Sequence, residues 1–312
     1  MNPTGTGGHR PVMLDEVMQG LAIQTSGFYV DGTYGGGGHA RALLAALGPA
    51  GRLLAIDKDP AAVARARAEF GADARVTVHH GSFAQLGEFV DQLGLRGRIA
   101  GILLDLGMSS IQLDDAERGF SFMRPGPLDM RMDTSRGPTA AQWLQDADEA
   151  RIAEVLREFG EERYARRIAA AIVARRAQAP IATTGELVEL VRGAMPRREQ
   201  HKHFATRTFQ ALRVAVNQEL DDLAAGLDQA LAVLAPGGRL VVLSFHSLED
   251  RPVKQFMRQH AGRYEGATGQ PALRLIRAPK KAGADELAVN PRARSAILRV
   301  AERLADAGPA DA

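Results

Sequence analysis

The chain has 312 residues, with 39 lysines and arginines, 37 aspartates and glutamates, and no cysteine. The length allows one large domain or two modest ones, and the absence of cysteine excludes disulfides, thiolate metal sites and cysteine nucleophiles. No apolar run approaches the length of a bilayer span, and residues 1–10 lack the apolar segment of a secretory signal. We therefore expect a soluble, unprocessed protein of the cytoplasm. Its net charge of +2 gives only weak long-range attraction to a polyanion.

The first half of the chain alternates short apolar runs with helical segments. Strands are expected at residues 28–31, 53–56, 75–80 and 99–106, separated by helices that include 40–47 and 61–70. After an interruption the pattern resumes with a helix over 220–234, a turn at 236–238 and strands at 239–245 and 296–300. Strands separated by helix-length segments predict an α/β fold with a doubly wound, mostly parallel sheet.

The interruption has a different composition. Residues 112–137 are rich in glycine, proline, methionine and aspartate and show no steady period. Residues 140–195 are helical in character, and apolar side chains such as Ile152, Val155 and Leu156 recur at helical spacing. We expect an inserted all-helical domain over 113–213, with residues 1–112 and 214–312 forming the sheet domain.

A glycine-rich loop from Asp31 to His39 lies between the first strand and its helix. Glycines let a backbone approach a ligand closely, and the N–H groups of the helix would face that ligand, so a nucleotide-like cofactor is indicated. A tight turn without a ligand is the alternative. Asp57 ends the next strand, about 20 residues later, where a carboxylate can accept both ribose hydroxyls. Its alternative role is to cap the following helix, which Asp59 could do instead.

Two further residues bear on the cofactor. Asp31 precedes the first glycine, where it would repel an anionic pyrophosphate but tolerate a sulfonium with a free amino group, so S-adenosylmethionine is favoured over NAD. Phe83 follows the third strand and offers a ring face for adenine, although a lone aromatic residue is more often part of the core.

Several segments are more specific. Residues 105–114 read DLGMSSIQLD, 118–123 RGFSFM and 126–133 GPLDMRMD; 9–13 read HRPVM, 205–213 ATRTFQALR, 243–251 LSFHSLEDR and 290–295 NPRARS. Together with the glycine loop, these segments resemble the bacterial family of 16S ribosomal RNA cytidine N4-methyltransferases, over residues 9–303. Few other families share anything close to them.

The resemblance implies a class I, Rossmann-like methyltransferase fold with an inserted helical domain, S-adenosylmethionine as the cofactor and no metal. It implies methylation of the N4 amino group of a decoding-site cytidine, with 16S ribosomal RNA within the small ribosomal subunit as the partner. Carried over by motif, the cofactor contacts would be Gly37, Gly38, His39, Asp57, Phe83, Asp105 and Gln112.

Methyl transfer from a sulfonium is an in-line displacement, in which an enzyme mainly holds the reacting atoms in line. The cytidine amine is a poor nucleophile, and an acceptor that holds its N–H would help. Asp105 ends the fourth strand at the crevice of the sheet and is the candidate catalytic residue. His246 follows the fifth strand, where a substrate contact and a structural hydrogen bond are equally open.

Residues 112–133 would form the rim of a pocket for an extruded base. Phosphate contacts are expected from basic residues if these share a face: Arg163, Arg166, Arg167, Arg197, Arg198, Lys202, Arg207 and Arg213. A methyltransferase with another acceptor and a non-catalytic RNA-binding assembly factor are the rival interpretations, with an oxidoreductase a distant third. The sequence leaves open a homodimer, and also whether naked RNA or an assembled subunit is the substrate.

Overall fold

The computed structural model describes residues 11–196, 204–262, 270–276 and 279–305. The chain divides into two compact units, one formed by Met1–Gly107 with Asp221–Ala312 and the other by Met108–Leu220. The sheet lies in the first unit, and the second is helical. In the described ranges, no helix is long and apolar enough to span a membrane.

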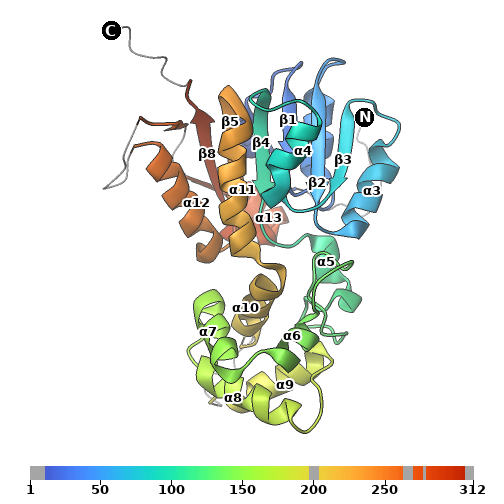
Figure 1. Cartoon of the computed structure of the whole chain (residues 1–312), viewed down its shortest axis with the longest axis vertical. Coiled ribbons are helices and arrows are strands. Elements are labelled where there is room, and N and C mark those ends of the chain that lie inside the picture. Colours follow the sequence, from blue (N-terminus) through green and yellow to red (C-terminus); the bar gives the residue numbers. More distant parts are fainter. Residues whose placement is uncertain (1–10, 197–203, 263–269, 277–278, 306–312) are drawn as a thin grey trace. The chain divides into compact units, whose positions relative to one another are not determined.

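The sheet has eight strands, of which seven follow the order β3-β2-β1-β4-β5-β8-β6, while β7 pairs with β8. Figure 1 shows β3, β2, β1, β4, β5 and β8 in this order. The strands are β1 (Phe28–Asp31), β2 (Arg52–Asp57), β3 (Val76–His80), β4 (Ile99–Asp105), β5 (Leu234–Ser244), β6 (Leu273–Leu275), β7 (Lys280–Lys281) and β8 (Ile297–Arg303). The pairs among β1 to β5 are parallel, and all pairs with β8 are antiparallel. This order reverses between β1 and β4, as in Rossmann-like class I methyltransferases, and confirms the expected fold class.

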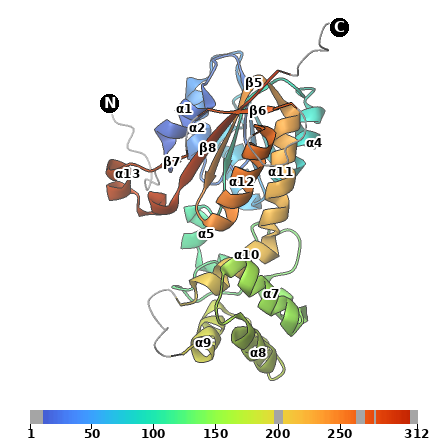
Figure 2. The ribbon, with the colours of Figure 1, turned by 90° about the vertical axis from the view of Figure 1, so that its left-hand side faces the viewer.

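Helices cover both faces of the sheet, because successive side chains of a buried strand point to opposite sides. In β1, Tyr29 packs with α1 (Leu14–Leu21), α2 (Gly38–Ala46) and α3 (Pro60–Phe70), whereas Val30 packs with α4 (Leu86–Gln92), α11 (Glu219–Val233) and α12 (Ser247–His260). Figure 2 shows α1 and α2 on one side of the sheet and α11 and α12 on the other. The near-continuous apolar runs in the sequence reflect this double burial.

The helical unit has its own core. Its helices are α5 (Ser110–Asp114), α6 (Ala140–Asp146), α7 (Glu149–Gly160), α8 (Ala165–Arg176), α9 (Thr184–Ala194) and α10 (Thr206–Asn217). Thr139 and Thr183 each begin a helix with a capping box, in which threonine and a Gln or Glu three residues later satisfy each other's backbone N–H groups. Ile152, Leu156 and Ile168 are fully buried in the core of this unit. The unit spans 108–220, and the insertion expected from the sequence spans 113–213.

The structure differs from the expected elements near the carboxyl end. The turn expected at 236–238 lies within β5, where the pairing register with β4 shifts between Ile99 and Gly101, and Gly237 has φ +79°. A glycine tolerates this conformation, so the chain bends without leaving the sheet. The short strands β6 and β7 were not expected. The described residues also form α13 (Ala284–Val289) and the 3-10 turns η1 (Phe83–Gln85), η2 (Ala116–Arg118) and η4 (Pro291–Ser295).

Candidate active site

Three aspartates end three neighbouring strands. Asp31 is the last residue of β1, Asp57 of β2 and Asp105 of β4, and these strands lie side by side in the order β2-β1-β4. Because the strands are parallel, their carboxyl ends share one edge of the sheet, where open α/β folds bind ligands. The structure therefore brings together the acids that the sequence singled out.

The glycine loop is tied across this edge by its backbone. The N–H of Gly32 donates to the carbonyl of Leu103 in β4 at 2.9 Å, and the N–H of Tyr34 donates to a carbonyl of β2 at 3.0 Å. The N–H of Gly35 donates to Oδ2 of Asp57 at 2.7 Å. The loop is thus fixed to the strands on both sides of β1, which makes it a preformed cradle.

Two glycines of the loop are required by the protein itself. Gly37 has φ +75°, and a Cβ atom there would lie 2.5 Å from the hydroxyl of Tyr34; a Cβ on Gly38 would lie 2.2 Å from Cγ of Pro11. Both positions exclude a larger residue before any ligand is considered. They also begin α2, whose N-cap Gly37 offers no side chain to the free N–H groups of the first turn.

Asp105 and His39 lie close to each other. Nε2 of His39 lies 3.6 Å from Oδ2 of Asp105, and His39 is buried. Oδ1 of Asp105 is buried and has no hydrogen-bond partner among the described residues, whereas 27% of the surface of the whole side chain is exposed. The backbone N–H of Asp105 donates to Oγ1 of Thr33 at 2.7 Å, and the N–H of Thr33 donates to Oδ1 of Asp31 at 3.1 Å. The backbone at Asp105 is thus fixed, and no hydrogen bond to a described residue satisfies Oδ1 of its carboxyl group.

Burial makes this edge unfavourable for negative charge. It raises the pKa of Asp31 to about 7, of Asp57 to about 6 and of Asp105 to about 8. Neighbouring carboxylates add to the rise, since Asp57 acts on Asp31, and both Asp31 and Glu249 act on Asp105. A bound cation would offset these repulsions, whereas an anion would increase them once the acids are ionised.

The two roles considered for Asp57 can now be separated. Asp59 is the N-cap of α3, because its Oδ1 accepts the N–H of Ala61 at 2.9 Å. Asp57 accepts the N–H groups of Gly35 and Asp59 at 2.7 and 2.8 Å, so it joins the glycine loop to the end of β2. Asp31 also has a structural role, because its Oδ1 accepts the N–H of Thr33. An aspartate at this position therefore does not by itself distinguish S-adenosylmethionine from NAD.

Phe83 begins η1 and is partly buried beside the core that α4, α11 and α12 share with the sheet. Its Cβ atom would lie 3.2 Å from a Cβ added to Gly32, so its base adjoins the glycine loop. Gln112 belongs to the helical unit, where its Oε1 accepts the N–H of Ser109 at 3.0 Å in a capping box. The sheet unit thus holds all the proposed cofactor residues except Gln112.

Sequence reasoning missed Glu249, a buried residue in the first turn of α12. Its Oε2 accepts the N–H of Phe245 at 2.8 Å, and its Oε1 lies 2.8 Å from Nε2 of His246. His246 therefore has a structural partner, as one of its two interpretations required. The motif at 243–251 contained the signal, because an acid three residues after histidine on a helix start can reach it.

The expected phosphate contacts fall into three groups. Arg163, Arg166, Arg167 and Arg207 are exposed on the helical unit. Arg213 was wrongly included: it is buried, and its guanidinium binds the carboxylate of Glu219 at 2.7 and 2.8 Å. Its neighbours in α10, including Phe209 and Leu212, place it on the buried face of that helix. Arg197, Arg198 and Lys202, like His9 and Arg10 of the first motif, lie outside the described residues.

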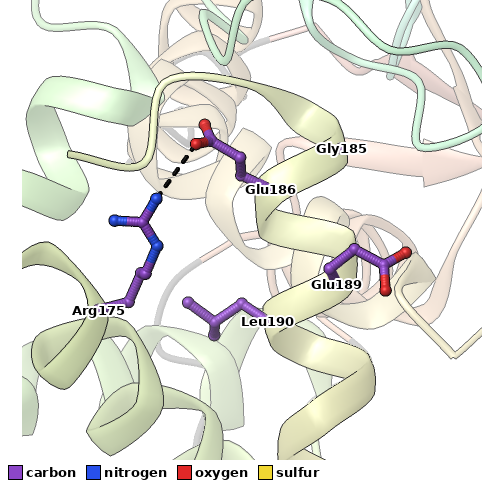
Figure 3. Close-up of a pocket in the computed structure, with 5 residues that line it drawn as sticks. All are labelled: Arg175, Gly185, Glu186, Glu189 and Leu190. Carbon is purple, nitrogen blue, oxygen red and sulfur yellow. Dashed lines mark hydrogen bonds and ion pairs between the residues drawn. The ribbon is translucent and has the colours of Figure 1, made fainter. Parts of the chain in front are cut away.

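A shallow pocket of about 380 Å³ lies between α8 and α9 of the helical unit (Figure 3). Arg175 and Glu186 form an ion pair of 3.3 Å across it, and Glu189 and Leu190 line the same helix face. It contains none of the residues predicted to bind the cofactor. We assign it no part in the site at the strand ends.

The chain matches the MraW methylase family over residues 6–304. The chain belongs to the MraW methylase family. It is 56% identical over 300 residues to ribosomal RNA small subunit methyltransferase H of Methylococcus capsulatus, with 94% of this chain and 100% of that protein covered. It is 55% identical over 329 residues to the protein of the same name from Cupriavidus necator, with 98% and 97% covered.

Membership of this methylase family confirms the resemblance inferred from the motifs. Among solved structures, an rRNA methylase from Streptococcus thermophilus covers 94% of this chain and 94% of its own, with 11% identity and a TM-score of 0.40. A Thermotoga maritima SAM-dependent O-methyltransferase covers 95% and 66%, with 9% identity and a TM-score of 0.42. The fold assignment for the MraW methylase chain rests on its strand order rather than on these distant likenesses.

Proposed function

We propose that this chain uses S-adenosylmethionine to methylate ribosomal RNA of the small subunit, and that the methylated atom is N4 of a decoding-site cytidine. Membership of a methylase family supports methyl transfer, and the names of the 55–56% identical relatives support the RNA substrate. The cytidine and its N4 atom follow from the motif resemblance stated above.

The observation that carries the proposal is the group of three aspartates at adjoining strand ends beside a fixed glycine loop. S-adenosylmethionine supplies an activated methyl group. It carries positive charges on its sulfonium and its amino group and a negative charge on its carboxylate, so it is a net cation. Carboxyl groups whose pKa is raised by burial and mutual repulsion would be stabilised as anions by such a ligand. Asp57 would accept hydrogen bonds from the ribose hydroxyls. Gly37, Gly38 and His39 would contact other parts of the cofactor.

Asp105 would serve the amine. Its carboxyl group, part of whose surface is exposed, would accept an N–H of the target. This hydrogen bond would align the nitrogen lone pair with the methyl group, and the carboxylate would receive the proton that the amine must lose. A pKa raised to about 8 makes Asp105 a stronger base than an ordinary carboxylate. His39, 3.6 Å away, would keep the carboxyl group oriented.

The helical unit would bind the RNA. Its exposed arginines, including Arg163, Arg166 and Arg167 around the start of α8, provide positive charge for phosphates without reading sequence. The motif resemblance also implies a cofactor contact at Gln112, and residues 112–133 would surround the target base. The base would have to leave its stack to reach the donor.

The proposal is tested by measuring which macromolecule of the small ribosomal subunit receives the methyl group. Purified protein is incubated with labelled S-adenosylmethionine and small ribosomal subunits from cells that lack the gene, and the RNA and protein fractions are then separated and counted. We expect label in the RNA alone. Label in the ribosomal proteins, or none in either fraction while the cofactor binds, would overturn the proposed acceptor.

A further inference from the structure

A carboxylate on α11 joins the two strand ends that carry the proposed adenosine contacts. Oδ2 of Asp222 accepts a hydrogen bond from Nζ of Lys58 at 2.6 Å and another from Oγ of Ser82 at 2.6 Å. Lys58 directly follows Asp57, and Ser82 directly precedes Phe83. The Asp222 side chain thus binds the residue next to Asp57, the proposed ribose contact, and the residue next to Phe83, the proposed adenine contact.

Ser82 passes this constraint to Phe83. While its hydroxyl donates to Asp222, its oxygen also accepts the N–H of Ala84 at 3.1 Å and so caps η1, the short turn that Phe83 begins. The β2 and β3 ends are also joined directly, since the N–H of Gly81 donates to the carbonyl of Asp57 at 2.9 Å. The turn carrying Phe83 is therefore attached on two sides.

Gly226 sets where the Phe83 ring can lie. It is four residues after Asp222 on α11, hence on the same helix face. A Cβ atom on Gly226 would lie 2.3 Å from Cδ2 and 2.7 Å from Cε2 of Phe83. Alanine is the better helix former at this position, so a glycine here costs helix stability that the close approach of the ring explains.

We propose that Asp222 and Gly226 of α11 are positioning residues for cofactor binding, which together fix the placement of Phe83 relative to Asp57 and so set the affinity for the adenosine part of S-adenosylmethionine. This inference rests on the proposed function. Neither residue would touch the reacting atoms, so methyl transfer at saturating cofactor should be nearly unaffected by their replacement.

The test uses S-adenosylhomocysteine as the probe in calorimetry of the full chain, because calorimetry reports the binding-competent fraction separately from Kd. We expect Asp222→Asn and Gly226→Ala each to raise Kd by about tenfold, with kcat within about twofold of wild type. Asp228→Asn, an exposed carboxylate on α11, and Gly193→Ala, an exposed helical glycine with open space around it, are the matched controls and should leave Kd unchanged.

A double variant tests whether Gly226 affects cofactor binding through the position of the Phe83 ring. If Gly226 acts through Phe83, the Gly226→Ala and Phe83→Ala changes together should raise Kd no more than Phe83→Ala alone. Additive losses, or an unchanged Kd in both α11 variants while the binding-competent fraction falls, would overturn the inference. Failure of the wild-type chain to bind the probe would instead overturn the proposed function and this inference with it.

Discussion

Replacing Asp105 with asparagine removes the proposed proton acceptor while keeping the size of the side chain. The wild-type carboxyl group has a pKa raised to about 8, so the acceptor form increases as pH rises through this value. For a single titration, the ionised fraction is about one-eleventh at one pH unit below the pKa and about ten-elevenths at one unit above it, a rise of about tenfold. A bound sulfonium would lower the pKa, so we expect the rise at or below pH 8.

The assay is single-turnover methyl transfer to small ribosomal subunits at saturating cofactor, from pH 6 to 9. We expect the wild-type rate to rise about tenfold over the two pH units centred on the pKa of Asp105. Asp105→Asn should be slower by about 10²-fold with a flat profile, because its amide cannot take the proton. Asp57→Asn is the control and should weaken cofactor binding rather than flatten the pH profile. An Asp105→Asn protein with wild-type rates, or with the wild-type pH profile, would refute this role of Asp105.

Three further outcomes follow from the site and the helical unit. Asp57 has a pKa raised to about 6, and a cationic cofactor favours its ionised form. Cofactor affinity should therefore rise with pH through about 6, and binding should release protons. Equal heats of cofactor binding in buffers of different ionisation enthalpy would contradict this. RNA affinity should fall steeply with salt, with a slope reduced by about 0.7–0.9 in Arg163→Ala, and a flat salt response would count against a phosphate contact. Arg213→Met should destabilise the protein by about 3–5 kcal/mol in urea unfolding, because the largely buried carboxylate of Glu219 loses its arginine. A loss below about 1 kcal/mol would show that the pair is not needed.

The sheet could be predicted from the sequence because its strands are buried on both faces. The run at 99–106 is almost entirely apolar, and the structure places β4 in the middle of the sheet. Strands β6 and β7 are only three and two residues long and contain arginine and lysine, so no periodicity could reveal them. Their pairing with β8 depends on residues distant in the chain.

The sequence likewise predicts some residues of the candidate site and not others. Asp31, Asp57 and Asp105 could be predicted because each ends an apolar run, and parallel strands bring such ends together. Asp222 could not, because it is one of several acids on α11, and only the fold brings it to Lys58 and Ser82. The expectation that Arg213 contacts phosphate was wrong. It relied on the positive charge of arginine and did not consider that Arg213 lies between residues on the buried face of α10.

The measurement that tests the central claim most directly is mass spectrometry of nucleosides and RNA fragments from small ribosomal subunits of gene-deleted cells, after incubation with this protein and S-adenosylmethionine. The account predicts N4-methylated cytidine at a single decoding-site position, present with the wild-type protein and absent without the cofactor. A methyl group on another base, on another atom of cytidine or at scattered positions would contradict it.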